Sequence, residues 1–395
     1  TSSMAQKINL LMVNYEYPPI GGGAGKAHQA LLREYALRDD LRVDVVASFC
    51  GRGVLVEQPA AHITLHRVGI RKKNLHYWTK PEVLEWLIKS RGVYDRLLRE
   101  NNYDLGHAFF AFPSGWLHYR SADRLPYILS LRGSDVPGYN IRLGIDYKLL
   151  SGLFRRIWNR ADAIVANSVG LARLAGQFTP NLSIDVIANG VDTRRYFPAS
   201  EPLPLRPLRI LSVSRLIRRK RLCLSIQAVQ KALESGLDVH FYIAGEGNLL
   251  GSLKKTAERL GLAERVHFLG RIEPEQMAEV YRQNHLLLMT SRHEGMSNAM
   301  LEAMACGLPV VTTHCEGVEE LIQGNGIVVD EPSPEKIGQA IKTLADRPSV
   351  YEAMSRASQD RAKQFSWEAA ADRYQTCYRR ILEHKRSARR QEPEP

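Results

Sequence analysis

The sequence predicts an α/β protein with two doubly wound parallel sheets that follow one another along the chain. Short apolar segments alternate with helical segments throughout, which is typical of βαβ units. The alternation stops at residues 200–207, SEPLPLRP, whose three prolines exclude regular structure, and it then restarts. A chain of 395 residues, 44% of them hydrophobic, is also long enough for two cores. We therefore expect two similar domains joined by this segment.

The first domain is expected over 4–200, with Met4 as the natural start of the chain. It begins with an apolar strand at 8–13, followed by the turn NYEYPPIGGG and a helix over 24–37. The further strands predicted for this domain, with helices between several of them, are 43–48, 63–68, 105–108, 127–131, 163–166 and 183–187.

The second domain is expected over 208–366, after a linker at 201–207. Its apolar runs predict strands at 210–213, 239–244, 266–269, 286–290, 310–313 and 326–329. Helical periodicity predicts helices at 223–235, 249–260, 274–283 and 318–323, and further helices between 334 and 382. The last of these, 367–383, can be capped by Ser366 and can pack back on the first domain. The charged, proline-bearing tail 384–395 is expected to fray.

Composition restricts the kind of protein. The formal net charge of +12 favours an anionic partner: a nucleotide sugar, a nucleic acid or an anionic lipid. Nucleic acid is the weakest of these, because aromatic residues do not interleave with the basic clusters and the usual motifs are absent. The five cysteines form no Cys-x-x-Cys pair, which favours reduced thiols in a cytoplasm over structural zinc. Without a long apolar run or a leader, we expect a cytoplasmic protein, soluble or peripheral at the inner face of the membrane.

One basic loop is a candidate for contact with an anionic membrane. The basic residues at 71–73 and Lys80 surround Tyr77 and Trp78, and Trp86 follows. A basic loop that exposes aromatic side chains can bind lipid headgroups. The alternative is a solvated charged loop whose aromatic side chains pack into the domain.

The segment 293–311, HEGMSNAMLEAMACGLPVV, is the most informative part of the chain. Glu294 precedes a predicted helix and Glu302 lies inside it, while Ser297 or Asn298 can cap the helix. A Gly-x-Pro stop and an apolar strand follow. Two glutamates at this spacing are ordinary on a surface helix, but the surrounding pattern makes the segment specific. The arrangement is suited to hold an activated sugar.

A glycine turn in the first domain is suited to bind an anion. Gly21, Gly22 and Gly23 lie between a strand and a helix, where backbone N–H groups and the helix dipole favour a diphosphate. A Walker loop would need glycine where Ile20 stands, and a dinucleotide fingerprint would need glycine where Lys26 stands. The turn therefore indicates neither an ATPase nor a dehydrogenase. A tight connection without a ligand is the alternative.

Further motifs lie between residues 186 and 272. Arg215 and Lys220, in SVSRLIRRKR, place two cations just after the first strand of the second domain, where parallel sheets bind ligands. Three other segments extend the pattern: VIANGVDTRRYFP at 186–198, IAGEG at 243–247 and FLGRI at 268–272.

Together these motifs resemble the retaining glycosyltransferases of family 4, also called glycosyl transferases group 1. The resemblance implies the GT-B fold, with Rossmann-like acceptor and donor domains facing across a cleft. It implies that Glu294 contacts the donor sugar, that Glu302 holds the ribose hydroxyls, and that Arg215 and Lys220 grip the diphosphate. The residue after the lysine, Arg221, departs from the glycine frequent in the family. The other donor-binding residues implied are Gly22, Gly23, Gly245, Arg271, Ile272, Gly295, Met296, Ser297 and Asn298.

The acceptor side contains the main departure from the family. Many relatives have a histidine after the strand that here reads YILSL, and this chain has Arg132. A guanidinium cannot accept a proton, so Arg132 is expected to bind an anionic group on the donor or the acceptor. Asp135 or His107 can take a polar role there, although a helix cap or a core histidine is the alternative for each. The resemblance also places Asn189 at the end of the first domain, near the cleft.

The resemblance implies transfer of a sugar from a UDP- or GDP-linked donor to an acceptor hydroxyl, with retention of the anomeric configuration. The acceptor is expected to be a glycan or a lipid-linked compound of bacterial surface polysaccharide synthesis. No cofactor is expected, and no metal, because the chain contains no Asp-x-Asp. The alternatives are a GT-B nucleotide-sugar epimerase and a noncatalytic basic scaffold that binds nucleic acid or membrane, with salt-dependent binding.

Overall fold

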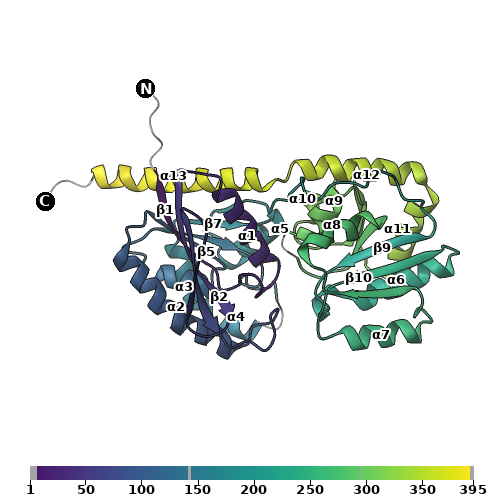
Figure 1. Ribbon diagram of the computed structural model, residues 1–395, viewed down its shortest axis with the longest axis horizontal. Coiled ribbons are helices and arrows are strands. Elements are labelled where there is room, and N and C mark those ends of the chain that lie inside the picture. Colours follow the sequence, from purple (N-terminus) through teal and green to yellow (C-terminus); the bar gives the residue numbers. More distant parts are fainter. Residues whose placement is uncertain (1–6, 141–143, 295, 392–395) are drawn as a thin grey trace, which may run out of the picture. The chain divides into compact units, whose positions relative to one another are not determined.

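The structure is a computed structural model that describes residues 7–140, 144–294 and 296–391 (Figure 1). Within these residues the chain forms two compact units. Unit 1 comprises residues up to 188 together with those from 367 onward, and unit 2 comprises 189–366. Each unit is built around one largely parallel sheet with helices packed on it, as the sequence predicts.

Unit 1 contains an eight-stranded sheet in the order β3-β4-β2-β1-β5-β6-β7-β8. The strands are β1 (Ile8–Val13), β2 (Leu41–Cys50), β3 (Val54–Ala60), β4 (Ile63–Ile70), β5 (Leu105–Phe109), β6 (Tyr127–Leu131), β7 (Ala163–Ala166) and β8 (Ile184–Val186). All neighbouring pairs are parallel except β3 with β4. The central strands β5 and β6 are buried along their whole length, because helices cover both faces of a parallel sheet.

The helices of unit 1 are α1 (Gly23–Tyr35), α2 (Lys80–Glu100), α3 (Ser114–Tyr119), α4 (Gly144–Arg160), α5 (Val169–Phe178) and α13 (Trp367–Gln391). α2 begins at a capping box in which Thr79 and Glu82 satisfy each other's backbone N–H groups. The last helix, α13, packs against α1, with the hydroxyl oxygens of Tyr35 and Tyr378 2.7 Å apart. The C-terminal segment is therefore part of the core of unit 1.

Unit 2 contains a six-stranded parallel sheet in the order β11-β10-β9-β12-β13-β14. The strands are β9 (Leu208–Val213), β10 (Val239–Ala244), β11 (Val266–Gly270), β12 (Leu286–Met289), β13 (Val310–Thr313) and β14 (Gly326–Val329). The helices are α6 (Leu222–Glu234), α7 (Leu250–Arg259), α8 (Pro274–Arg282), α9 (Asn298–Ala305), α10 (Val318–Leu321), α11 (Pro334–Asp346) and α12 (Pro348–Lys363). The chain builds outward from β9 to β11 and returns to β12 on the other side of β9, so the order of the sheet reverses there.

Three features differ from the sequence prediction. The antiparallel edge strand β3 was not predicted, because VLVEQPA contains a proline and shows no alternation of buried and exposed residues. The units divide at 188/189 and not at 200–207, since Asn189 and Val191 bond to partners within unit 2. The helix α13 continues to Gln391, beyond the predicted end at 383, and Lys385 pairs with Asp162 at 2.7 Å. Residues 392–395 of the expected tail lie outside the described residues.

Candidate functional site

The carboxyl ends of β9 and β12 form the centre of the candidate site in unit 2. β9 is followed by Arg215 and by a single 3₁₀ turn, Arg218–Lys220, and β12 is followed by the loop that contains Glu294. The two strands are neighbours at the point where the order of the sheet reverses. Open parallel sheets bind ligands at such a point, because the loops on its two sides diverge and leave a crevice.

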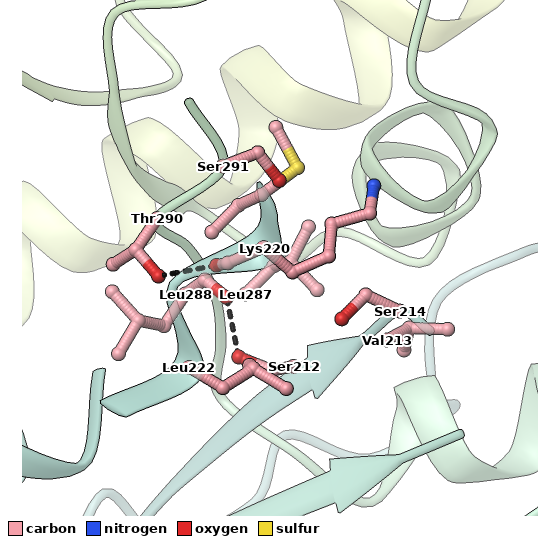
Figure 2. A pocket seen from close by; sticks show the side chains of 10 residues that line it. Ser212, Val213, Ser214, Lys220, Leu222, Leu287, Leu288, Thr290 and Ser291 are labelled. Carbon is pink, nitrogen blue, oxygen red and sulfur yellow. Dashed lines mark hydrogen bonds between the residues drawn. The ribbon is translucent and has the colours of Figure 1, made fainter. Parts of the chain in front are cut away.

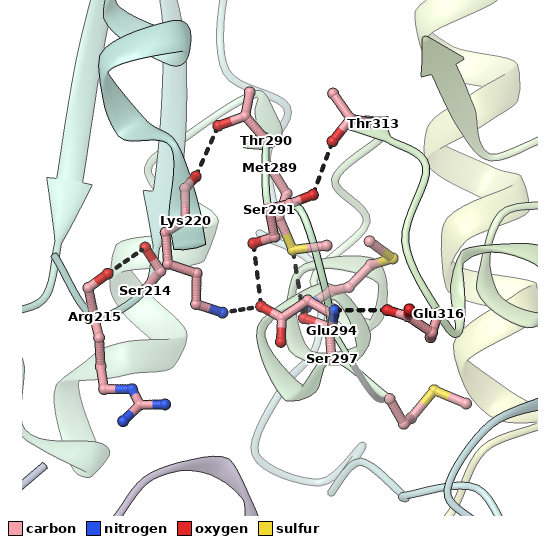
Figure 3. A network of polar contacts seen from close by, with 12 residues as sticks. Ser214, Arg215, Lys220, Met289, Thr290, Ser291, Glu294, Ser297, Thr313 and Glu316 are labelled. Carbon is pink, nitrogen blue, oxygen red and sulfur yellow. Dashed lines mark hydrogen bonds and ion pairs between the residues drawn. The ribbon is translucent and has the colours of Figure 1, made fainter. Parts of the chain in front are cut away.

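Lys220 and Glu294 form an ion pair at this point (Figure 3). The Ser291 hydroxyl also donates to Glu294 Oε1, at 3.2 Å. The turn behind the lysine is fixed by the Thr290 hydroxyl, which lies 3.0 Å from the carbonyl oxygen of Lys220. Burial, together with the nearby charges of Arg219 and Arg215, lowers the pKa of Lys220, whereas the contact with Glu294 favours its charged form. The structure thus brings these two predicted site residues together.

Arg215 lies on the lysine side of the ion pair and is half-buried (Figure 3). Its carbonyl oxygen accepts a hydrogen bond of 3.3 Å from the Ser214 hydroxyl. Next to the pair, a cavity of about 10 Å³ lies between β9 and β12 (Figure 2), lined by residues that include Ser212, Ser214, Lys220, Thr290 and Ser291. That volume holds roughly one water molecule, so a larger ligand has to bind at the edge of the sheet.

The loop before α9 is held by its own polar groups and by Asn189. The Ser297 hydroxyl caps the helix by accepting from the backbone N–H of Met300 at 3.3 Å. The Asn189 amide donates to Asn298 Oδ1 at 2.9 Å and to the carbonyl oxygen of Met296 at 3.2 Å. Asn189 therefore belongs to unit 2 and supports the loop of the glutamate motif. The predicted donor residue Gly295 lies outside the described residues.

Glu302, in the second turn of α9, is held by two tyrosines that the sequence did not indicate. The Tyr281 hydroxyl donates to Glu302 Oε2 at 2.9 Å, and Tyr196 makes a second side-chain hydrogen bond to the same carboxylate. The two rings pack edge to face, 5.9 Å apart. Burial and the adjacent carboxylate raise the pKa of Tyr281, so its hydroxyl keeps its proton and donates. The arrangement fixes the direction in which Glu302 presents its oxygens.

A third carboxylate, Glu316, was also missed. It follows β13, and its two oxygens lie 3.1 Å from the backbone nitrogen of Glu294 and 3.1 Å from His293 Nδ1. Glu316 thereby fixes the loop that carries Glu294. A carboxylate soon after a buried strand was the available signal, but the sequence alone gave no reason to prefer Glu316 over other carboxylates.

Gly245, Arg271 and Ile272 follow the adjacent strands β10 and β11. Gly245 has φ +138°, and a Cβ there would lie 1.9 Å from the carbonyl oxygen of Ser214, so only glycine fits. Arg271 is exposed and pairs with Glu273 at 3.7 Å, while Ile272 is half-buried. All three lie at the same edge of the sheet as the Lys220 and Glu294 pair.

The glycine turn of unit 1 connects β1 to α1, but two of its amides are already engaged. The backbone N–H of Gly21 donates to the carbonyl oxygen of Leu75 at 2.7 Å. The backbone N–H of Gly22 donates to Glu16 Oε2 at 3.3 Å. Gly22 is the N-cap of α1, without a side-chain cap, and Gly23 is the first residue of the helix. An anion at this helix end would compete with the Glu16 carboxylate. The second proposed role of the turn, a tight connection, is supported by Gly21, whose φ is +90°.

The turn after β6 carries Arg132 and Asp135, both buried. Asp135 accepts hydrogen bonds from the backbone N–H groups of Ala111 (2.7 Å), Arg132 (2.9 Å) and Gly133 (3.0 Å). Burial raises the pKa of Asp135, and these amides oppose that shift. Asp135 thus organises the turn, which resembles the capping role considered for it. The Arg132 guanidinium lies over the Phe109 ring at 4.9 Å.

His107, in β5, is fully buried, with both ring nitrogens in hydrogen bonds. Burial lowers its pKa well below 6.5, so the ring is neutral. This is the environment of a core histidine. Unit 1 therefore contains Gly22, Gly23, His107, Arg132 and Asp135, and unit 2 contains the other predicted site residues that the structure describes.

The basic loop before α2 exposes one aromatic side chain. Tyr77 is 46% exposed, whereas Trp78 packs on Tyr15 and Trp86 is fully buried. The alternative considered for this loop, in which the aromatic side chains pack into the domain, therefore holds for both tryptophans. Among the described residues, no helix is both long and apolar enough to cross a membrane, and no three metal-ligating side chains gather in one place.

Two family models cover most of the chain. The one described as Glycosyltransferase Family 4 matches residues 21–195, and the one described as Glycosyl transferases group 1 matches 194–361.

Curated relatives match at moderate sequence identity. A D-inositol 3-phosphate glycosyltransferase of Segniliparus rotundus is 29% identical over 78% of this chain and 65% of its own length. A phosphatidylinositol N-acetylglucosaminyltransferase subunit of Arabidopsis thaliana is 31% identical over 50% of this chain and 44% of its own length. The chain thus spans less than two thirds of the length of these two relatives. An N-acetyl-alpha-D-glucosaminyl L-malate synthase of Bacillus anthracis is 26% identical over 93% and 96%.

Solved structures share the fold at low sequence identity. Sucrose-phosphate synthase from Thermosynechococcus elongatus matches with a TM-score of 0.80 and 18% identity, over 96% of this chain and 100% of that one. HepE from Anabaena, in complex with UDP and glucose, matches with a TM-score of 0.68 and 19% identity, over 94% and 99%. Both likenesses extend over both units, so the whole chain has the fold of these two proteins.

Proposed function

Since the chain belongs to glycosyltransferase family 4 and has the GT-B fold, we propose that it transfers a sugar from a nucleoside diphosphate sugar to an acceptor hydroxyl. The single observation that carries the proposal is the contact between Lys220 and Glu294 where the sheet of unit 2 reverses. A cation and a carboxylate at that point suit a donor with a diphosphate at one end and sugar hydroxyls at the other.

In this proposal, Lys220 and Arg215 hold the diphosphate and stabilise the negative charge that develops as it leaves. Glu294 holds hydroxyls of the transferred sugar, and Glu302, oriented by Tyr281, holds the ribose. The departing phosphate accepts the proton of the attacking hydroxyl on the same face of the sugar, which gives retention. The cations replace a metal in this scheme, and no cofactor takes part.

The donor is proposed to be linked to UDP or GDP. HepE, which shares the fold, has been solved with UDP and glucose and with UDP-glucose. The described backbone around Arg271 and Ile272, after β11, is the part of unit 2 proposed to meet the base. Gly245 allows close approach beside it, and Met296, Ser297 and Asn298 line the sugar.

The acceptor is proposed to be an anionic hydroxy compound, bound by unit 1. The names of three relatives pair a glycosyl transfer with an anionic compound: inositol 3-phosphate, phosphatidylinositol and L-malate. The buried cation Arg132 and the net charge of +12 support the same choice. Use in bacterial surface glycan or glycolipid synthesis accords with WaaG, a structural relative described as involved in lipopolysaccharide biosynthesis.

Peripheral contact with an anionic membrane is part of the proposal. Tyr77 is 46% exposed, and Leu84 and Ile88, four residues apart on α2, are 58% and 66% exposed. Lys73 and Arg91 are exposed in the same segment. Apolar side chains among basic ones suit an anionic lipid surface. Flotation with anionic vesicles, lost on Leu84→Ser with Ile88→Ser and absent with neutral vesicles, would support this contact.

The test of the function is a transfer assay with UDP-glucose, UDP-N-acetylglucosamine and GDP-mannose against L-malate and inositol 3-phosphate. We expect one glycosylated product whose anomeric configuration, read by proton NMR, matches that of the donor. An inverted product would overturn the proposed stereochemistry. A new nucleotide sugar formed without an acceptor would identify an epimerase instead.

A further inference from the structure

A continuous chain of hydrogen bonds crosses the core of unit 1, from the turn after β6 to helix α1. Its members, in order, are Arg132, Tyr374, Ser130, His107, Tyr378 and Tyr35, and all are buried. Arg132 bonds to the Tyr374 hydroxyl. The next four separations are 3.0 Å, 2.7 Å, 2.7 Å and 2.7 Å. We call these six residues the polar chain.

The C-terminal helix supplies two of the six members. Tyr374 and Tyr378 are four residues apart on α13, so both point from the same face of the helix into the core. His107 and Ser130 come from the neighbouring strands β5 and β6. The polar chain thus connects α13 to the strand that ends next to Arg132.

The donor-only chemistry of arginine fixes the direction of the polar chain. Tyr374 has to accept from Arg132, so its own proton turns away from the guanidinium, toward Ser130. Ser130 then donates to His107 Nε2. The single ring proton of neutral His107 is left on Nδ1, from which it donates to Tyr378.

The opposite direction is unfavourable for an electrostatic reason. Ser130 would then donate to Tyr374, whose own proton would be buried beside the guanidinium without an acceptor in the polar chain. In the direction that we derive, the hydroxyl proton without an acceptor in the polar chain is that of Tyr35, at the end opposite to the Arg132 guanidinium. The charge of Arg132 therefore favours the Nδ1–H tautomer of His107, although the two residues are not adjacent in the polar chain.

We propose that Tyr374 is a positioning residue that fixes the guanidinium of Arg132, and that His107 is held by the same polar chain as the Nδ1–H tautomer. The role of Arg132 toward an anionic acceptor rests on the proposed function, whereas the polar chain rests on the hydrogen bonds alone. The Phe109 face lies 4.9 Å from the guanidinium. The Phe109 ring and the Tyr374 hydroxyl together hold the Arg132 guanidinium at the carboxyl end of β6. Helix α13 thus positions a residue on the proposed acceptor side.

The first test needs no substrate. In protein labelled with ¹⁵N in histidine and arginine side chains, two-bond correlation spectra show which ring nitrogen of His107 carries the proton. His107→Gln and Arg132→Lys assign the two residues by the loss of their signals. We expect the Nδ1–H tautomer in the wild type and in Tyr35→Phe, and faster water exchange of the Arg132 Nη protons in Tyr374→Phe only. A proton on Nε2 in the wild type, or unchanged Arg132 exchange in Tyr374→Phe, would overturn the inference.

The second test separates positioning from folding. Tyr374→Phe and Tyr35→Phe each remove one buried hydroxyl from the polar chain and leave the ring in place. With L-malate or inositol 3-phosphate as acceptor, we expect Tyr374→Phe to raise the acceptor KM about tenfold, the equivalent of one lost hydrogen bond, without changing nucleotide affinity. Tyr35→Phe should change neither, and equal effects of both variants would contradict the role. If the wild type glycosylates neither acceptor, the proposed acceptor class is wrong, whereas the spectra still test the direction of the hydrogen bonds in the polar chain.

Discussion

Lys220 and Glu294 contact each other across the two halves of the sheet of unit 2. The lysine follows β9, where one half begins, and the glutamate follows β12, where the other half begins. Each charge is largely removed from water, with 11% and 13% of the side chains exposed, and each neutralises the other. In the proposed reaction a donor gives both residues new partners, a diphosphate for the lysine and sugar hydroxyls for the glutamate.

Removing the charge of Glu294 should impair the chemical step. Glu294→Gln keeps the shape of the side chain and leaves Lys220 with a weaker partner. Because the proposed contacts of Glu294 are to the transferred sugar, we expect kcat to fall about 10²-fold or more, while the nucleotide alone binds with nearly unchanged affinity. Steady-state kinetics and calorimetry measure the two effects. The matched control is Glu279→Gln, an exposed glutamate on α8. Wild-type kcat in Glu294→Gln would contradict the assignment.

Loss of the Tyr281 hydroxyl should weaken nucleotide binding through Glu302. Tyr281→Phe removes the 2.9 Å hydrogen bond and keeps the buried ring. A typical hydrogen bond contributes about 1 kcal/mol, so the dissociation constant for the nucleotide should rise roughly fivefold. Tyr242→Phe, at a half-buried position of strand β10, serves as the control. If both variants bind the nucleotide as the wild type does, Tyr281 does not orient Glu302.

A methyl group at Gly245 should destabilise unit 2. The added Cβ would lie 1.9 Å from the Ser214 carbonyl oxygen, at a φ that side chains rarely adopt. We expect Gly245→Ala to lower the free energy of unfolding by about 2 kcal/mol or more. Gly251→Ala, in helix α7 with open space around the added atom, should instead raise it by about 0.5 kcal/mol. Thermal melting by circular dichroism compares the two, and equal melting would refute the steric argument.

Buried neutral histidines should make unit 1 sensitive to acid. Burial lowers the pKa of His118 to about 3, and burial with the charge of Arg132 lowers that of His28 to about 3. Below pH 6.5 these histidines bind protons in the unfolded chain but stay neutral in the folded unit. Stability is therefore complete above pH 6.5 and is lost as the pH falls toward 3, by about 1 kcal/mol per pH unit for each histidine.

Tryptophan fluorescence can follow this loss in unit 1 selectively, because all five tryptophans of the sequence lie in that unit. Urea unfolding between pH 7.5 and 5 should show a falling midpoint in the wild type and a smaller fall in His118→Gln. The control His314→Gln, an exposed residue of unit 2, should behave as the wild type. A midpoint independent of pH in the wild type would exclude the mechanism.

The predicted fold agrees well with the structure wherever burial dictates the pattern. β1, β6, β7, β10, β13 and β14 occupy the predicted residues, because each is a short run rich in apolar and β-branched residues with no fully exposed position. The exposed edge strand β3 has no such run, and pairing with β4 alone defines it. The unit boundary could not be read from proline content, since the hydrogen bonds of Asn189 to residues more than a hundred positions away determine it.

The part of the candidate site that the sequence predicted consists of charged residues soon after strands. Lys220 and Glu294 each lie a few residues after a strand of unit 2, so their contact follows from the sheet order. The residues that orient the site, such as Tyr281 and Glu316, come from other elements and are selected only by the folded geometry. Burial of Arg132 was likewise not foreseen, because α13 covers it from the far end of the chain.

The most direct test of the proposed donor site is calorimetric titration with UDP, GDP and ADP, without added metal. The wild type is compared with Glu302→Ala and with Glu279→Ala as a control on the neighbouring helix. We predict saturable binding of UDP or GDP by the wild type and the control, and at least about tenfold weaker binding by Glu302→Ala. Folded wild-type protein that binds none of the three nucleotides would contradict the donor site in unit 2.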